Sequence, residues 1–123
     1  LKRMAGDKTK EIEQLTRKRG LLMEKHRDTL KLGLQRYNEA MAGQTTVLWK
    51  KHDFESFASY YSLVDVEYVA SLDADYDGLS PKQKFFLIME HMDKSETEIQ
   101  NALGVAEVTM RSIRSRIGKK HKA

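Results

Sequence analysis

The chain has 123 residues, of which 40% are hydrophobic and 33% charged, with one proline, seven glycines and no cysteine. This composition is typical of a helical, highly solvated protein rather than a compact β or α/β domain. Without cysteine the chain forms no disulfide and has no thiolate ligand or nucleophile, which fits a reducing compartment. No apolar run approaches the length of a membrane span, and no signal peptide is visible. We therefore expect an all-α, cytoplasmic protein.

The net charge of +4 conceals a strong asymmetry along the chain. Residues 1–64 hold 13 basic and 8 acidic side chains, whereas residues 65–79 hold five acidic side chains and no basic one. Residues 80–123 hold 9 basic and 5 acidic side chains, and residues 108–123 alone carry six basic side chains and no acidic one. Such a local basic patch matters more to a polyanion than the total charge does.

Residues 1–51 are rich in helix formers and contain no proline. Apolar side chains at Leu30, Leu34, Tyr37 and Met41 are separated by four, three and four residues, which is a heptad pattern. We predict one long, coiled-coil-like helix in this segment that joins two chains in a homodimer. The alternative is a single helix folded back on the next segment, without a partner chain.

Residues 52–79 are predicted to form an aromatic helical connector followed by an acidic loop. Phe54, Phe57 and Tyr61 are spaced three and four apart, so they share one helical face. A stripe of this kind is typical of a buried core rather than a ligand cage. A second short helix is expected over residues 65–72.

Residues 80–123 contain three short apolar segments, each with its own helix-start signal. Residues 80–83 (Ser-Pro-Lys-Gln) combine a Ser N-cap, a first-turn proline and a capping box. Ser95 and Glu98 form a second capping box, and Gly104 can supply the positive φ that ends a helix and turns the chain. The last helix begins at about residue 107. This order predicts a helix-turn-helix domain.

The periodicity of the last helix separates its buried side from its exposed side. Met110, Ile113 and Ile117 mark the inward direction, and in this type of unit the N-terminal half of the helix enters the major groove. The alternative is that its basic side chains only solvate the helix and complement its dipole. The outward side carries Arg111, Ser112, Ser115 and Lys119, which we call the outward row and predict to bind DNA, with Thr109 near the mouth of the groove. We predict that the DNA backbone phosphates are bound by Arg114, Arg116, Lys119 and Lys120.

Residues 79–83 and 95–117 resemble the LuxR-type, sigma-region-four-like helix-turn-helix family, and the resemblance covers about a third of the chain. Gln100 replaces a small alanine of the family pattern, Ala106 replaces its N-cap serine, and Val108 is apolar where an exposed polar residue is usual. The resemblance implies a helix-turn-helix output domain that binds double-stranded DNA. The positions that match the family pattern are Ser95, Glu98, Ile99, Leu103, Gly104, Thr109 and Arg111, with Met110 in place of a valine.

The wider layout is similar to the C-terminal part of Bacteroidetes-type sensor-regulators, which often carry tetratricopeptide repeats and a membrane span before a coil. This resemblance implies the cytoplasmic output end of a larger, membrane-anchored protein. The chain also begins with Leu1 rather than Met, so we expect it to be a piece of a longer protein. Within this piece we expect no membrane contact.

Residues 73–78 (Asp-Ala-Asp-Tyr-Asp-Gly) match the first half of an EF-hand calcium loop. The second half fails, because Lys84 stands where a bidentate Glu is required and Pro81 begins a helix early. The four histidines are scattered without ligand spacing, so we expect no metal and no cofactor. A further option is that this acidic stretch lies against the basic helix and moderates DNA binding.

We predict a DNA-binding transcriptional regulator module, dimerised by its N-terminal helix. The chain shows no nucleophile motif, no Gly-rich phosphate loop and no convincing carboxylate pair, so we do not expect an enzyme. The alternative is a protein-interaction module that contacts RNA polymerase or another regulator without binding DNA. Val108 on the outward side favours this alternative.

Overall fold

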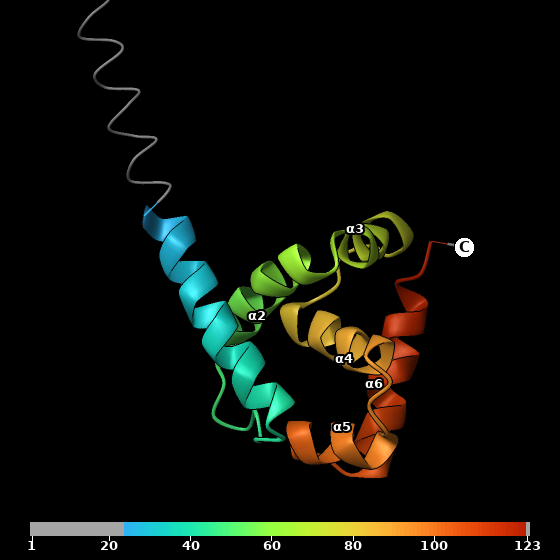
Figure 1. Cartoon of the computed structure of the whole chain (residues 1–123). Helices are drawn as coiled ribbons and strands as arrows, with labels where there is room; N and C mark the ends of the chain where they lie inside the picture. The colour runs from blue at the N-terminus through green and yellow to red at the C-terminus, as the bar shows by residue number, and fades with distance from the viewer. Residues whose placement is uncertain (1–23, 123) are drawn as a thin grey trace, which may run out of the picture.

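The computed structural model describes residues 24–122, which form six α-helices (Figure 1). Within this range the only strand-like pairing is an isolated bridge between Tyr76 and His121, so the predicted all-α fold is confirmed. None of the described helices is both long and apolar enough to cross a bilayer. The helices span residues 24–41 (the first helix), Lys51–Val64 (α2), Val66–Asp75 (α3), Pro81–His91 (α4), Glu96–Leu103 (α5) and Glu107–Lys119 (α6).

The capping signals in the sequence set the bounds of α4 and α5. Ser80 Oγ accepts a hydrogen bond from the backbone N of Gln83 at 3.1 Å, while Gln83 Oε1 accepts one from the backbone N of Ser80 at 2.9 Å. Ser95 and Glu98 form the same reciprocal pair at the start of α5. Gly104 ends α5 with a left-handed φ of 64°. Both capping boxes and the glycine stop are confirmed, and they satisfy helix-end groups that would otherwise lack partners.

The first helix ends ten residues before the end of the predicted long helix. Gly43 adopts a φ of 79°, and residues 42–50 form an irregular loop. Thr46 holds this loop on α5, because its backbone N and its Oγ1 both donate to the carbonyl oxygen of Ala102, at 2.6 and 3.0 Å. The expectation of one helix as far as residue 51 is therefore wrong. These bonds to α5 replace the helical bonds that the local sequence favours.

The first helix packs on α2 through a glycine rather than through a leucine seam. A Cβ atom on Gly33 would lie 2.2 Å from the carbonyl oxygen of Ser56 and 2.6 Å from Cβ of Tyr60. Leu34, which belongs to the predicted heptad pattern, is instead 42% exposed. The two helices therefore cross at a distance that only glycine permits at this position. The part of the predicted coil in residues 1–23 lies outside the described residues.

A buried ion pair fixes the same two helices. Arg36 Nε donates to Asp53 Oδ1 at 3.0 Å, and the backbone N of Lys50 donates to Asp53 Oδ2 at 2.8 Å. Burial alone would raise the pKa of Asp53, but the bonds from Lys50 and Arg36 outweigh it and hold that pKa below its ordinary value. Asp53 therefore remains charged while it caps the start of α2.

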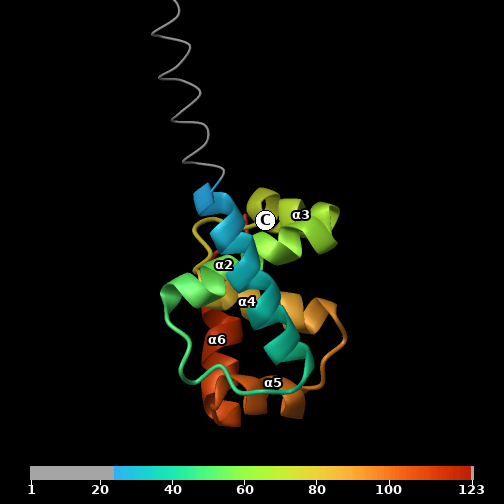
Figure 2. The ribbon, with the colours of Figure 1, turned by 60° about the vertical axis from the view of Figure 1, so that its left-hand side comes forward.

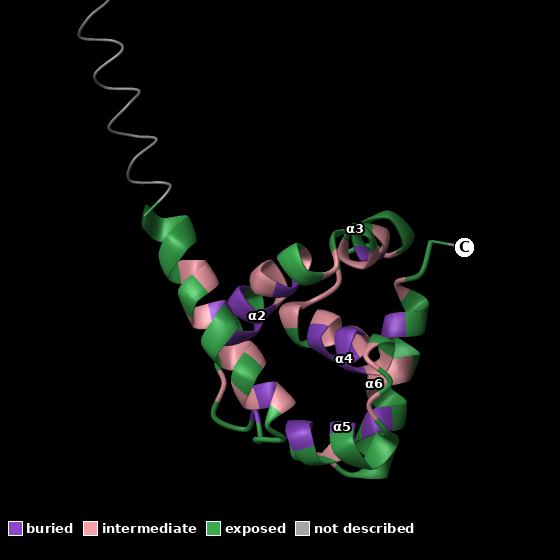
Figure 3. Ribbon diagram, viewed as in Figure 1, coloured by how far each residue is buried: buried purple, intermediate pink, exposed green. Residues whose placement is uncertain are grey.

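The predicted aromatic stripe is core, as expected. Phe85 of α4 lies at its centre, with ring centroids 4.9 Å from Phe57, 5.5 Å from Phe54 and 5.5 Å from Trp49. All five labelled helices contribute buried residues (Figure 3). The core thus draws on all three predicted segments, and α4, α5 and α6 share it with α2.

We predict that Gly33→Ala lowers the free energy of unfolding by about 1–3 kcal/mol, because the added methyl group must displace the backbone of α2. Gly118→Ala is the matched control, since nothing lies within 4 Å of a Cβ atom there. Urea unfolding followed by circular dichroism measures both variants. Equal stability of the two would contradict the close crossing at Gly33.

Candidate nucleic-acid interface

Helix α6 lies at one edge of the arrangement of helices in Figure 1, with α5 beside its N-terminal end. Met110 is 1% and Ile117 4% exposed, and Ile113 is half-buried, so the inward face predicted from the periodicity is confirmed. The opposite side of the helix is open to solvent. Its exposed polar residues include Thr109 and the whole outward row, Arg111, Ser112, Ser115 and Lys119.

The first turn of α6 combines a weak ion pair with open backbone donors. Arg111 lies 3.0 Å from Glu107, and both side chains are largely exposed, so this surface pair contributes little to stability. Ala106 provides no side-chain cap, which leaves the first N–H groups of α6 free of a side-chain acceptor. Arg111 and these N–H groups could therefore meet a phosphate or a base edge at little energetic cost. Val108, 72% exposed, adds an apolar patch to this end.

Arg114 braces the three helices rather than pointing into solvent. Its guanidinium donates to Glu96 of α5 and, at 3.4 Å, to Glu90 of α4, and it lies 5.6 Å from the ring centroid of Phe86. The hydrogen bond to Glu96 is the main cause of a raised pKa at Arg114. These contacts link α6 to both of its neighbours. The structure thus gives Arg114 a positioning role in addition to the predicted phosphate contact.

Lys120, another predicted phosphate ligand, is also engaged within the chain. Its Nζ donates to the carbonyl oxygen of Gly78 at 2.8 Å and to Gln83 Oε1 at 2.7 Å. It therefore fastens the end of α6 to the start of α4. Periodicity could not show this bond, because its acceptors lie about forty residues away in sequence.

Arg116 stays exposed and flanks a hollow of about 230 Å³ between α4 and α6. Lys82 and Thr109 also line it, so the hollow collects two cations and a hydroxyl near the N-terminus of α4. Cations and a helix N-terminus favour an anion of phosphate size. Sequence reasoning missed Lys82, although its place in the first turn of α4 was a signal for it.

The acidic stretch is partly helical. Asp73 and Asp75 lie in the last turn of α3, which corrects the expectation of a loop at these positions. Asp73 Oδ1 lies 3.3 Å from Lys84 Nζ, so this carboxylate has a partner within the chain. In residues 24–122 no group of three or more His, Asp or Glu side chains is arranged to hold a metal ion. The chain after α3 instead meets the end of α6.

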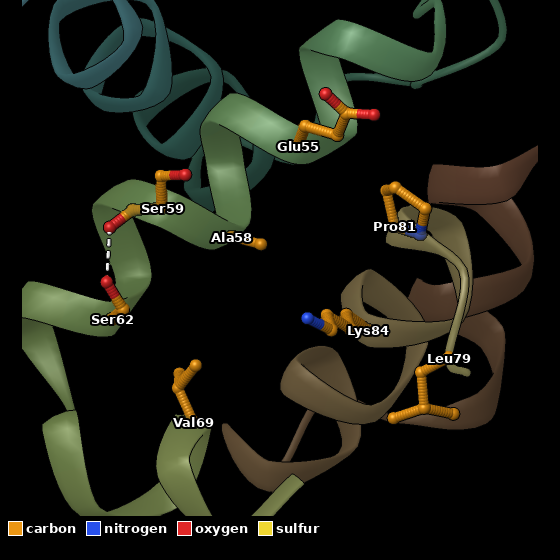
Figure 4. A pocket seen from close by; sticks show the side chains of 8 residues that line it. All are labelled: Glu55, Ala58, Ser59, Ser62, Val69, Leu79, Pro81 and Lys84. Atoms are coloured by element: carbon orange, nitrogen blue, oxygen red, sulfur yellow. Dashed lines mark hydrogen bonds between the residues drawn. The ribbon is translucent and has the colours of Figure 1, made fainter. Parts of the chain in front are cut away.

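A second hollow of about 390 Å³ lies between α2, α3 and the start of α4 (Figure 4). Lys84 points into it from α4. On the opposite wall, within α2, Ser62 Oγ donates to the carbonyl oxygen of Ser59 at 2.6 Å. Leu79 and Val69 form part of its wall. Lys84 also pairs with Asp73, at 3.3 Å.

Comparison with known proteins yields no family assignment. No known family model matches the chain, and neither a curated protein nor a solved structure was found to be similar to it. The geometry of α4, α5 and α6 is therefore the basis on which a function is proposed.

We predict that Arg114→Ala lowers the free energy of unfolding by about 1 kcal/mol, through loss of its two ion pairs and its ring contact. Arg116→Ala removes the same charge from an exposed position and should change stability by less than about 0.5 kcal/mol. Thermal unfolding of both variants measures the difference. Equal effects of the two substitutions would contradict the proposed stabilising contacts of Arg114 with α4 and α5.

Proposed function

We propose that this chain is a DNA-binding transcriptional regulator module with α6 as its recognition helix. The observation that carries the proposal is the exposed outward row on a helix whose opposite side is buried against the domain. The order of three short helices, the two capping boxes and the left-handed Gly104 agree with a helix-turn-helix. DNA as a partner places the module in the cytoplasm.

In the proposed complex the N-terminal half of α6 enters the major groove. Arg111 is long enough and sufficiently exposed to bind the O6 and N7 atoms of a guanine, and Ser112 follows it on the same side. Lys119, which lies further along the outward row of α6, contacts a backbone phosphate. The hollow between Arg116 and Lys82 takes a second phosphate.

A protein-interaction module that contacts RNA polymerase or another regulator is the second candidate. It is favoured by Val108 and by Val47, which are 72% and 62% exposed. Val47 lies close to Gly104, where its Cγ2 would be 2.5 Å from an added Cβ. These apolar side chains surround the turn before α6 and would suit a protein surface better than DNA.

The module is proposed to act as a homodimer through its N-terminal helix. Leu34 supports this proposal, because it is an apolar side chain of that helix with 42% of its surface exposed. A second copy would cover this side chain. Two-fold pairing would also present two α6 helices to two half-sites of an operator.

We predict that the chain binds random duplex DNA with an affinity that falls steeply with salt, as measured by fluorescence anisotropy. Arg111→Ala should weaken binding to a preferred operator about tenfold or more, because a bidentate base contact is lost. Lys119→Ala should reduce the slope of log affinity against log salt by about one. Lys51→Ala, on the exposed start of α2, is the control for loss of a charge. Absence of binding at low salt would contradict the proposal.

We predict that the chain is a dimer at tens of micromolar and that Leu34→Lys shifts it to monomer, because the charge would be buried between two helices. Light scattering coupled to size-exclusion chromatography measures the mass. Lys31→Ala, on the same helix, serves as the control. A monomeric parent chain would exclude the dimer.

A further inference from the structure

The chain that follows α6 is bound to the chain that follows α3. The backbone N of Asp77 donates to the carbonyl oxygen of Lys120 at 2.8 Å, and the backbone N of Lys122 donates to the carbonyl oxygen of Asp75 at 2.9 Å. These two bonds flank the antiparallel bridge of Tyr76 with His121. In Figure 1 the chain after α6, in red, rises toward α3. We call this arrangement, residues 75–78 against residues 120–122, the clamp.

One ion pair and one side-chain hydrogen bond also cross the clamp. Lys122 Nζ lies 3.5 Å from Asp77 Oδ1, and Lys120 Nζ donates to the carbonyl oxygen of Gly78. The ring of Tyr76 meets that of His121 edge-on, with centroids 4.9 Å apart. Each surface contact is weak, but the two backbone bonds hold the tail in one place.

We propose that the clamp is an autoinhibitory contact, in which the acidic chain after α3 holds back the cationic tail from the DNA backbone. This inference depends on the proposed DNA binding. The tail continues directly from Lys119 of the outward row, so on release Lys122 becomes free to follow the phosphates beside the major groove, while Lys120 keeps its bond to Gln83 Oε1 of α4. Opening the clamp therefore adds a phosphate contact without altering the base-reading half of α6.

The geometry permits a test in which net charge stays constant. In an antiparallel pair flanked by hydrogen bonds in this way, the two facing residues form the closely spaced, non-hydrogen-bonded type, with Cα atoms about 4.5 Å apart. That spacing suits a disulfide. The chain has no cysteine of its own, so Tyr76→Cys combined with His121→Cys places one thiol pair in the clamp. Oxidation then locks the clamp closed, and reduction removes the covalent lock so that the clamp can open.

We expect the reduced double variant to bind duplex DNA more tightly than the oxidised form of the same protein. Each added phosphate contact steepens the slope of log affinity against log salt by about 0.9, so the affinity ratio grows about threefold per contact between 200 and 50 mM salt. Equal affinity and equal slope in the two states would overturn the clamp proposal, as would tighter binding by the oxidised form. Absence of binding in both states would instead contradict the proposed function.

A charge variant keeps the inference testable should the double variant fail to fold. Asp77→Asn removes the partner of Lys122, whereas Glu67→Gln removes an equal charge from the exposed first turn of α3. We expect Asp77→Asn to raise DNA affinity and steepen the salt slope more than Glu67→Gln. Equal effects of the two substitutions would show that only the net charge matters and would overturn the clamp.

Discussion

The aromatic contacts around Phe85 determine how the rest of the domain is arranged. This ring is fully buried on α4, and Trp49, Phe54 and Phe57 surround it from the preceding loop and α2. Aromatic pairs at these distances contribute more to stability than burial of their surface area alone would. Because α4 is also the first of the three helices proposed to bind DNA, this unit cannot be separated from α2 without exposing its own core.

Local signals were predicted correctly, because their causes lie within a few residues of one another. The capping boxes at Ser80 and Ser95, the stop at Gly104 and the inward face of α6 all depend on neighbours one to four positions away. Such interactions depend on side-chain chemistry and helical spacing alone. The all-α architecture and the exposure of the outward row follow from the same short-range rules.

Contacts between distant segments were not predictable in this way. The engagement of Arg114 and Lys120 depends on how α6 crosses α4 and α5, which no single helix encodes. From the sequence alone Gly33 is only a weak helix former. Its packing role becomes clear where α2 crosses the first helix. The early end of the first helix likewise depends on a partner, Ala102, found more than fifty residues away. The heptad pattern predicted too long a helix, because it contains no information about these distant partners.

The loop of residues 42–50 has a mechanical consequence. It joins the first helix to α2, yet Thr46 also fastens it to Ala102, two residues before the turn that leads into α6. The helix that enters the domain is therefore joined to the region just before α6 by hydrogen bonds as well as by the chain itself.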